Sequence, residues 1–148
     1  MNFFLGVDPG ASGGIGWIWE GGSGVTSFKN LTEQEIMSAF RERRECFATH
    51  HWLATIERVH SMPKQGVSSS FKFGASYGFL RGILHSLMIP FEEVAPQTWQ
   101  KSLGCLSGGV KAVTKSKAQQ LFPALKLTHS TADAILIAEY ARRKHGAP

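Results

Sequence analysis

Cysteine is scarce in this sequence, and its scarcity excludes two classes of protein. The 148 residues contain only Cys46 and Cys105, which lie far apart and form no metal-type pair. Neither a disulfide-stabilised scaffold nor a cysteine-based zinc site fits this pattern, so we expect reduced thiols in a reducing compartment. Internal repeats, low-complexity tracts and linkers are also lacking, and the composition is that of an ordinary globular protein.

Long apolar runs are lacking as well. No run approaches the roughly 20 residues that a bilayer-spanning helix requires. The first residues provide neither the basic region nor the long apolar core of a signal peptide. We therefore expect a protein that neither spans a membrane nor is secreted.

Acidic residues are outnumbered by basic ones. The chain has 11 Asp and Glu against 16 Lys and Arg, a net charge of +5, and a sequence pI near 9.5. A polyanionic partner is plausible on this ground, although charge alone does not prove one. The length predicts a single domain, residues 1–148, with room for a sizeable core.

The most informative stretch lies at the start of the chain. An apolar run at residues 3–7 is typical of a buried strand, and it ends on the carboxylate of Asp8. A glycine-rich turn over residues 9–14 leads into a second apolar run at residues 15–19. Asp8 is then either a turn residue bonded to nearby backbone amides or a carboxylate that faces a metal ion or phosphate.

The remaining pattern predicts strands followed by alternating helices and strands. A third strand should close an antiparallel meander with the first two. The helix starts are indicated by a capping box at Thr32 and Glu35, by the serines 68–70, by Pro96 and by Thr114. The predicted strands after the second are at 25–29, 52–56 and 91–95, and the predicted helices are at 33–47, 68–88, 96–103, 114–122 and 130–143.

The predicted helix at 68–88 is apolar on two sides. Gly74, Gly78 and Gly82 recur every fourth residue, and apolar residues such as Leu84 lie on roughly the opposite side. Each glycine costs a helix about 1 kcal/mol relative to alanine, so three in register indicate the close approach of another backbone. Either both sides are covered within one chain, or a partner subunit covers one of them.

Three carboxylates stand where the predicted elements would bring them together. Asp8 and Glu57 each end a strand, and Asp133 lies in the first turn of the last helix. His129 precedes Asp133 by four residues, which places the two on nearly the same helical face. Neighbouring carboxylates repel and raise one another's pKa unless a divalent cation is bound. Oxygen ligands suit Mg²⁺ or Mn²⁺, and two such ions can promote phosphodiester hydrolysis.

These motifs together resemble a known fold and a known family. The order of elements resembles the ribonuclease H-like fold, and the chain resembles RuvC-type Holliday junction resolvases. The resemblance is carried by Leu5-Gly6-Val7-Asp8-Pro9-Gly10, by Ile56-Glu57-Arg58-Val59 and by Asp133-Ala134 in the last helix. The segment from His60 to Phe71 is similar to the phage and chloroplast branch of that superfamily.

The resemblance implies both an architecture and an activity. The architecture is an α/β fold with a five-stranded mixed sheet flanked by helices, in which the first three strands are antiparallel and the fourth and fifth parallel. The activity is that of a homodimeric endonuclease that nicks two opposed strands of a four-way DNA junction, with two Mg²⁺ or Mn²⁺ ions per active site. The expected location is the cytoplasm of a bacterial or phage-infected cell, or an organelle.

Roles in metal binding follow for the acids. We predict that Asp8 bridges both ions, that Glu57 ligates one, and that Asp133 holds the other. Many relatives carry a fourth acid where this chain has His129. His129 is then either a neutral ligand, which would favour Mn²⁺ relative to Mg²⁺, or a surface histidine at a helix start.

Contacts to DNA are predicted in two segments. Lys117 is the candidate for the scissile phosphate, and Lys111 and Lys115 are candidates for holding the backbone, unless all three are simply solvated. The loop that follows Glu57 should lie beside the cut strand and set any sequence preference. Its predicted DNA-binding residues are Met62, Pro63, Lys64 and Gln65.

A junction with two-fold symmetry requires two identical sites, so we expect a homodimer, formed through the helix at 68–88. Three other interpretations stay open. The first is a nuclease of the same fold that acts on RNA or RNA–DNA hybrids, because fold alone does not choose the substrate. The second is a phosphate-binding module, since residues 6–10 also resemble the first nucleotide-binding loop of actin-like kinases. The third is a junction-binding protein without catalysis.

Overall fold

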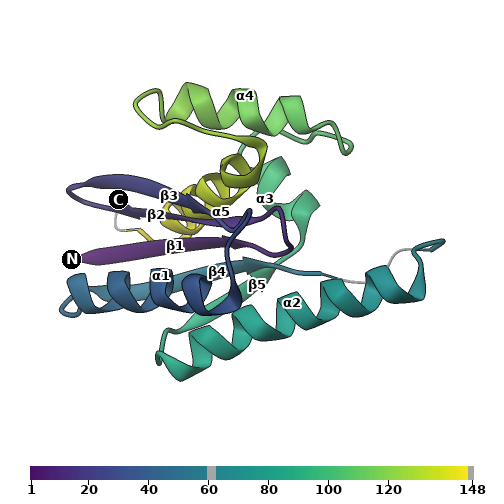
Figure 1. Ribbon diagram of the computed structural model, residues 1–148. Helices are drawn as coiled ribbons and strands as arrows, with labels where there is room; N and C mark the ends of the chain where they lie inside the picture. The colour runs from purple at the N-terminus through teal and green to yellow at the C-terminus, as the bar shows by residue number, and fades with distance from the viewer. Residues whose placement is uncertain (60–62, 147–148) are drawn as a thin grey trace.

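A five-stranded mixed sheet forms the middle layer of the protein (Figure 1). The computed structural model describes residues 1–59 and 63–146. The strands are β1 (Asn2–Asp8), β2 (Gly14–Trp19), β3 (Gly22–Ser27), β4 (His51–Glu57) and β5 (Phe91–Val94), in the order β3-β2-β1-β4-β5. The pairs β1–β2 and β2–β3 are antiparallel, and the pairs β1–β4 and β4–β5 are parallel. The predicted mixed sheet is confirmed.

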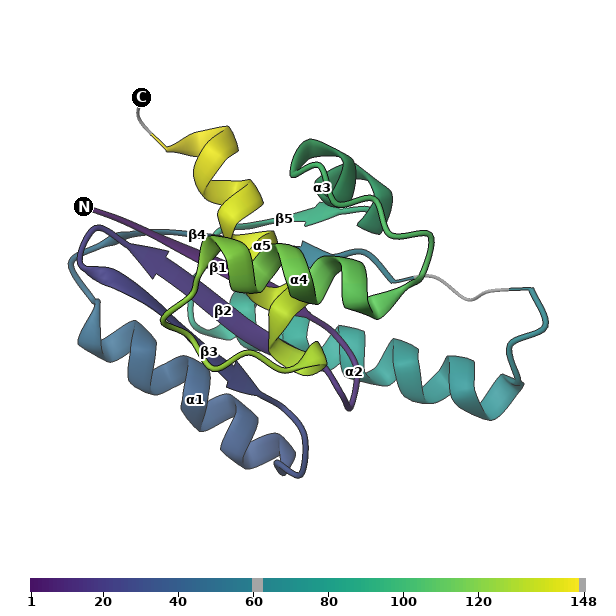
Figure 2. The same cartoon turned by 90° about the horizontal axis from the view of Figure 1, so that it is seen from above.

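Helices cover both faces of this sheet (Figures 1 and 2). One face carries α1 (Glu33–Cys46) and α2 (Val67–Ser86), and the other carries α3 (Pro96–Ser102), α4 (Lys111–Leu121) and α5 (His129–His145). The long α5 packs against β1, β2 and β4, and both α3 and α4 pack against α5. Within the described ranges, no helix combines the length and the apolar character needed to cross a membrane.

Strand alternation decides which face each acid occupies. Side chains on a strand point alternately to opposite faces of the sheet. In β1, Val7 belongs to the core beneath α1 and α2, whereas Gly6 lies against α5. Asp8, two residues after Gly6, is therefore on the α5 side. By the same alternation, Glu57 follows the core residue Ile56 and also belongs to the α5 side.

Two predicted boundaries in the first half of the chain need correction. The third strand is Gly22–Ser27, not residues 25–29, because a short turn at Glu20 and Gly21 pairs Trp19 with Gly22. Pairing with β2 thus builds a strand from glycine and serine without an apolar run. The serines 68–70 do not cap α2, since the helix begins at Val67 and the amide of Ser70 donates to the carbonyl of Gly66.

Two helix starts in the second half also differ from prediction. α4 begins at Lys111, and Thr114 is a buried residue inside the helix rather than its cap. α5 begins at His129 rather than near residue 130, and the amide of Thr128 donates to the hydroxyl of Thr131 at its start. Both helices therefore extend far enough toward their N-termini to bring their first residues near the end of β1.

Two glycines let α5 lie almost directly on the sheet. Gly6 of β1 and Gly16 of β2 are register partners. A Cβ added at Gly6 would collide with the carbonyl oxygen of Ala134, and one added at Gly16 would lie 2.6 Å from the backbone of Ile135. No side chain larger than hydrogen fits in this contact, so the backbone of α5 rests on both strands.

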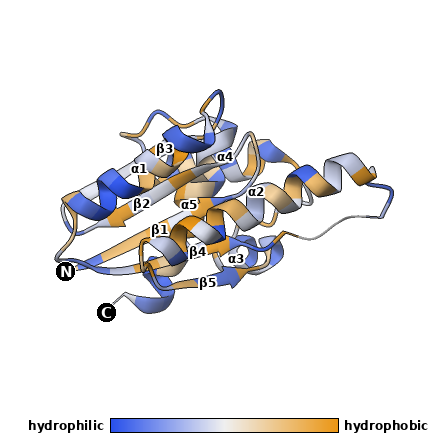
Figure 3. Ribbon diagram, turned by 60° about the horizontal axis from the view of Figure 1, so that its bottom comes forward, coloured by the Kyte–Doolittle hydropathy of each residue, from blue (hydrophilic) through white to orange (hydrophobic). Residues whose placement is uncertain are grey.

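The glycines of α2 have a different setting. A Cβ added at Gly74, Gly78 or Gly82 meets nothing within 4 Å, whereas Leu84 on another side of the helix is fully buried against the sheet. The N-terminal half of α2 projects beyond the sheet and still carries apolar residues (Figure 3), among them Phe71, which is 77% exposed. The described part of the chain therefore leaves this glycine stripe uncovered.

Replacing Gly6 with alanine tests the contact between α5 and the sheet. We expect Gly6→Ala to lower the free energy of unfolding by about 3 kcal/mol or more, because a backbone rather than a flexible side chain must move. The control is Gly74→Ala in α2, where the added methyl meets nothing within the chain, and it should change this free energy by less than about 1 kcal/mol. Urea unfolding followed by circular dichroism measures both. Equal effects of the two substitutions would contradict the close contact.

Candidate active site

Three carboxylates meet at one end of the sheet, on the α5 side. The parallel register of β1 and β4 pairs Val7 with Ile56, so Asp8 and Glu57 leave adjacent strands side by side. Asp133, the fifth residue of α5, completes the group. The three lie close enough that the charges of Glu57 and Asp133 both raise the pKa of Asp8.

The turn after Asp8 holds its backbone at the end of β1. The amide of Gly13 donates to the carbonyl of Gly10 at 3.1 Å, and Gly10 has a φ of 111° that favours glycine. A Cβ at Gly13 would collide with the carbonyl oxygen of Asp8. The chain therefore reverses tightly enough to keep Asp8 paired with Gly14 of β2.

A hollow of about 390 Å³ opens beside this group. Asp8, Asp133, His129 and Lys111 all contribute to its walls. His129 and Asp133, one helical turn apart on α5, thus share this hollow as the sequence spacing predicts. The remaining lining residues come from the turn after β1 and from two helices: Pro9, Gly10, Ala11, Ser12, Gly13, Phe73 and Thr114.

Burial is the main cause of raised pKa values at the site. It raises the pKa of Asp8 well above its usual range, and Lys111 opposes this with its positive charge. It raises the pKa of Glu57 to about 7, against a hydrogen bond from Trp99 that lowers it. It also raises the pKa of Asp133, which a hydrogen bond with Thr114 and the charge of Lys111 lower. The site therefore stabilises the neutral acids until positive charge is supplied.

Sequence reasoning missed two residues that contact these acids. Trp99 of α3 donates its indole N–H to Oε2 of Glu57 at 2.7 Å. Thr114 of α4 lowers the pKa of Asp133, and its hydroxyl donates to the carbonyl of Lys111 at 3.3 Å. The sequence carried a weak signal for each: Trp99 is a large apolar residue in a short polar helix, and Thr114 was interpreted as a cap.

The predicted lysines separate in the structure. Lys111 lines the hollow, and its positive charge lowers the pKa values of Asp8 and Asp133. Lys117 lies farther along α4, where its charge lowers the pKa of the buried Cys105 thiol against the effect of burial. Lys115 is half-buried and is not part of the hollow's lining. Lys111 therefore lines the hollow beside the carboxylates, and Lys117 is not among the residues that line it.

The predicted recognition loop is described only in part. Met62 lies outside the described residues. Pro63 and Lys64 are exposed, and Gln65 donates from its side-chain amide to the hydroxyl of Ser69 at 3.3 Å. This loop follows Glu57 and connects β4 to α2.

The donor set fits a hard divalent cation. Oδ1 of Asp133 is buried and has no hydrogen-bond partner in the described part of the chain, and the three acids supply only oxygen ligands. Among the same residues, no three His, Cys, Asp or Glu side chains form a ready-made cage. Mg²⁺ rarely needs one, because it usually keeps several waters and binds one or two carboxylates together with phosphate.

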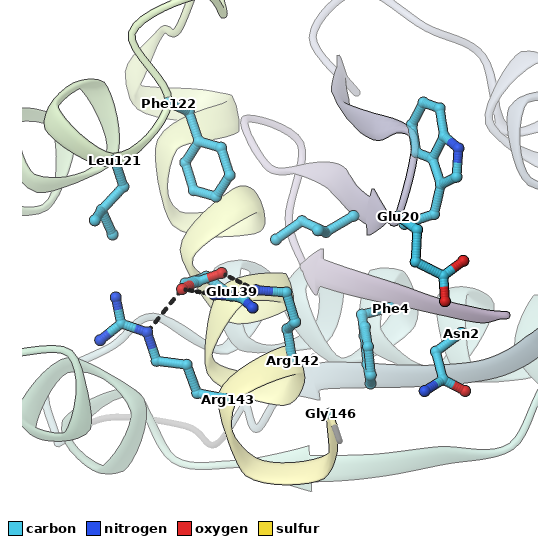
Figure 4. A pocket seen from close by; sticks show the side chains of 11 residues that line it. Asn2, Phe4, Glu20, Leu121, Phe122, Glu139, Arg142, Arg143 and Gly146 are labelled. Atoms are coloured by element: carbon cyan, nitrogen blue, oxygen red, sulfur yellow. Dashed lines mark hydrogen bonds and ion pairs between the residues drawn. The ribbon is translucent and has the colours of Figure 1, made fainter. Parts of the chain in front are cut away.

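A second hollow, of about 630 Å³, lies at the other end of α5 (Figure 4). Its buried carboxylate is Glu139, which accepts hydrogen bonds of 2.7–2.8 Å from Arg142 and Arg143. These ion pairs lower the pKa of Glu139 against the opposing effect of burial. The buried acid of this hollow is therefore compensated by two arginines, unlike the carboxylates of the candidate active site.

The raised pKa of Glu57 predicts a pH-dependent stability. A carboxyl with a pKa raised from 4.5 to about 7 stabilises the fold below pH 4.5, and this contribution is lost as the pH rises through 7. We expect Glu57→Gln to raise the free energy of unfolding of the metal-free protein at pH 8 by about 1–3 kcal/mol. At pH 5 the change should nearly vanish. Urea unfolding with a chelator at both pH values measures this, and an equal effect at both would contradict it.

Comparison with solved structures places this site on a known fold. The structure is similar to that of T. thermophilus RuvC in complex with a Holliday junction substrate, with a TM-score of 0.64, 16% sequence identity, and coverage of 98% of this chain and 97% of that chain. A second structure, of Thermus thermophilus RuvC, gives a TM-score of 0.58, 15% identity and 96% coverage of both chains. No protein-family model and no curated protein matches the sequence. The chain has the RuvC-like, ribonuclease H-like fold.

Proposed function

We propose that this protein is a divalent-metal-dependent DNA endonuclease that resolves four-way junctions. The observation that carries the proposal is the meeting of Asp8, Glu57 and Asp133 at one sheet end, with a buried oxygen of Asp133 left without a partner. The fold adds support, since the similar T. thermophilus RuvC structure contains a Holliday junction substrate.

The acids divide the work of binding cations. Asp8 lies close to both Glu57 and Asp133, so we propose that Asp8 and Glu57 would hold one ion and that Asp8 and Asp133 would hold the other. Bound Mg²⁺ or Mn²⁺ would supply the positive charge that activates water and stabilises the leaving oxygen of a phosphodiester. His129 lines the same hollow and is proposed to join Asp133 as a neutral ligand.

Basic residues position the nucleic acid. Lys111 lies in the hollow beside the acids and is proposed to hold the phosphate that is cut. Lys115 and Lys117 continue along α4 and are proposed to contact the backbone farther away. The exposed Pro63 and Lys64, with their neighbours Met62 and Gln65, are proposed to contact bases near the cut and so to influence sequence preference.

A homodimer would place two such sites on one junction. The glycine stripe of α2 is uncovered in the described part of the chain, and apolar residues continue along the projecting half of this helix. A second copy that packs its own α2 against this stripe would bury both features in a two-fold interface. Such an interface presents two identical active sites, which paired cuts in a symmetric junction require.

Removing the charge of each acid tests the catalytic proposal. Asp8→Asn, Glu57→Gln and Asp133→Asn should each lower the rate of junction cleavage in Mn²⁺ at least about a hundredfold, because each removes a charged oxygen ligand. Affinity for the junction, measured by gel shift, should stay within a few fold. The control is Glu45→Gln, an exposed acid of α1 on the opposite face.

The substrate is tested with the same wild-type protein. A synthetic four-way junction, an RNA–DNA hybrid and a linear duplex are compared at equal concentration in Mn²⁺. We expect paired nicks in the junction and little cleavage of the other two. Preferential cleavage of the hybrid would contradict junction resolution and favour ribonuclease activity. In the acid-variant experiment, undiminished cleavage by a variant would show that the substituted residue is not part of the site.

Replacing Gly78 with leucine tests the dimer. The added side chain enters open space in one chain, so Gly78→Leu should leave the fold intact while separating the two copies. Light scattering after size exclusion should show a dimer for the wild type and a monomer for the variant. Lys72→Leu, an exposed position off the stripe, is the control and should remain dimeric. A dimeric Gly78→Leu variant would place the interface elsewhere.

A further inference from the structure

Trp99 links the core on the α5 side directly to one of the site's acids. Its side chain is fully buried and packs in the core that includes Val94, Leu103 and Ile135. Its indole N–H donates to Oε2 of Glu57 at 2.7 Å, across 42 residues of sequence. Within the described part of the chain, no other side chain donates to this carboxylate. The bond to Trp99 engages Oε2 and leaves Oε1 of Glu57 without a side-chain donor.

We propose that Trp99 is a positioning residue that holds Oε2 of Glu57 so that Oε1 is presented to a divalent cation. The inference deepens the proposed function and rests on it, because it assigns to Trp99 the orientation of a metal ligand. Residues that hydrogen-bond to metal ligands in this way typically contribute 10–100-fold to metal affinity.

The backbones on both sides of the hydrogen bond are fixed. Glu57 ends β4 and is paired with Val94 of β5, and the amide of Arg58 donates to the carbonyl of Val94 at 2.7 Å. α3 follows within two residues of β5, and the amide of Trp99 donates to the carbonyl of Ala95 at 3.4 Å. Only the side-chain torsions of Glu57 are then free to rotate, and the hydrogen bond from the indole restricts this rotation before a ligand binds.

Tryptophan has the right chemistry for this task. Its N–H is a donor only and carries no charge. A lysine or arginine in the same place would neutralise the carboxylate and weaken its attraction for a cation. The buried indole instead fixes one oxygen and leaves the negative charge available to the site.

A similar arrangement holds Asp133. The buried Thr114 lowers the pKa of its carboxyl, and Oδ1 is left without a partner in the described part of the chain. Two acids from different elements therefore each lie beside an uncharged polar side chain, Trp99 for Glu57 and Thr114 for Asp133, supplied by a helix on the α5 side. The repetition supports orientation of the ligands, rather than chance packing, as the role of Trp99.

The test compares two tryptophans that make the same kind of bond. Trp52 is also buried and donates its indole N–H to the carbonyl of Phe47 at 2.9 Å, but it lies on the α1 side, away from the acids. Trp99→Phe and Trp52→Phe each delete one indole hydrogen bond. We expect Mn²⁺ binding, measured by calorimetry without DNA, to weaken about tenfold or more in Trp99→Phe and to stay unchanged in Trp52→Phe.

A double-mutant cycle identifies the partner. In a Glu57→Gln background, Trp99→Phe should weaken Mn²⁺ binding no further, because the oriented ligand is already absent. If Trp99→Phe does not fold, incorporation of 3-benzothienylalanine at position 99 keeps the ring shape and replaces the N–H by sulfur. This replacement should give the same loss of affinity in a folded protein.

The outcomes separate this inference from the proposed function. If Asp8→Asn abolishes Mn²⁺ binding but the changes at Trp99 leave it intact, the positioning role is overturned and the metal site is kept. If Mn²⁺ does not bind, or binds equally well after Asp8→Asn, the proposed function is overturned instead. A loss of stability in Trp99→Phe with unchanged Mn²⁺ affinity would assign Trp99 to packing alone.

Discussion

The close approach of α5 to β1 and β2 is the constraint on which the rest of the structure depends. Gly6 and Gly16, paired across two strands, remove the side chains that would otherwise separate helix and sheet. The helix backbone can then rest on the strands at Ala134, directly after Asp133. Core packing and the position of the third acid are therefore set by one contact, and a change that lifts the helix alters both.

The acids at the sheet end show how a fold can accommodate a group of unfavourable charges. Each carboxyl has a pKa raised mainly by burial, and neighbouring acids raise the pKa values of Asp8 and Glu57 further. The surrounding donors, Trp99 and Thr114, are uncharged, and Lys111 supplies only one positive charge. Sites that are poised for ligand binding often cost stability in this way, because the compensating charge arrives with the ligand.

The sequence predicted the fold better than it predicted the site's contacts. Apolar runs and glycine turns act locally, so most of the strands and the strand-end acids Asp8 and Glu57 could be predicted from the chain, whereas the mixed sheet was implied by the family resemblance. The start of β3 could not, because pairing with β2 rather than composition fixes it. Thr114 and Trp99 act on acids 19 and 42 residues away, and no local pattern reports such contacts. The sequence likewise could not show which lysine of α4 faces the acids, because the turn of the helix puts Lys111, and not Lys117, in the lining of the hollow.

The chain order of the three acids has a consequence for biosynthesis. Asp8 and Glu57 belong to strands made early, whereas Asp133 belongs to α5, which follows every strand of the sheet. A nascent chain that has emerged only as far as β5 lacks both the third acid and the helix that seals its core. Any chemistry that requires all three carboxylates is therefore withheld from ribosome-bound intermediates and from truncated products, and it becomes available only when the fold is finished.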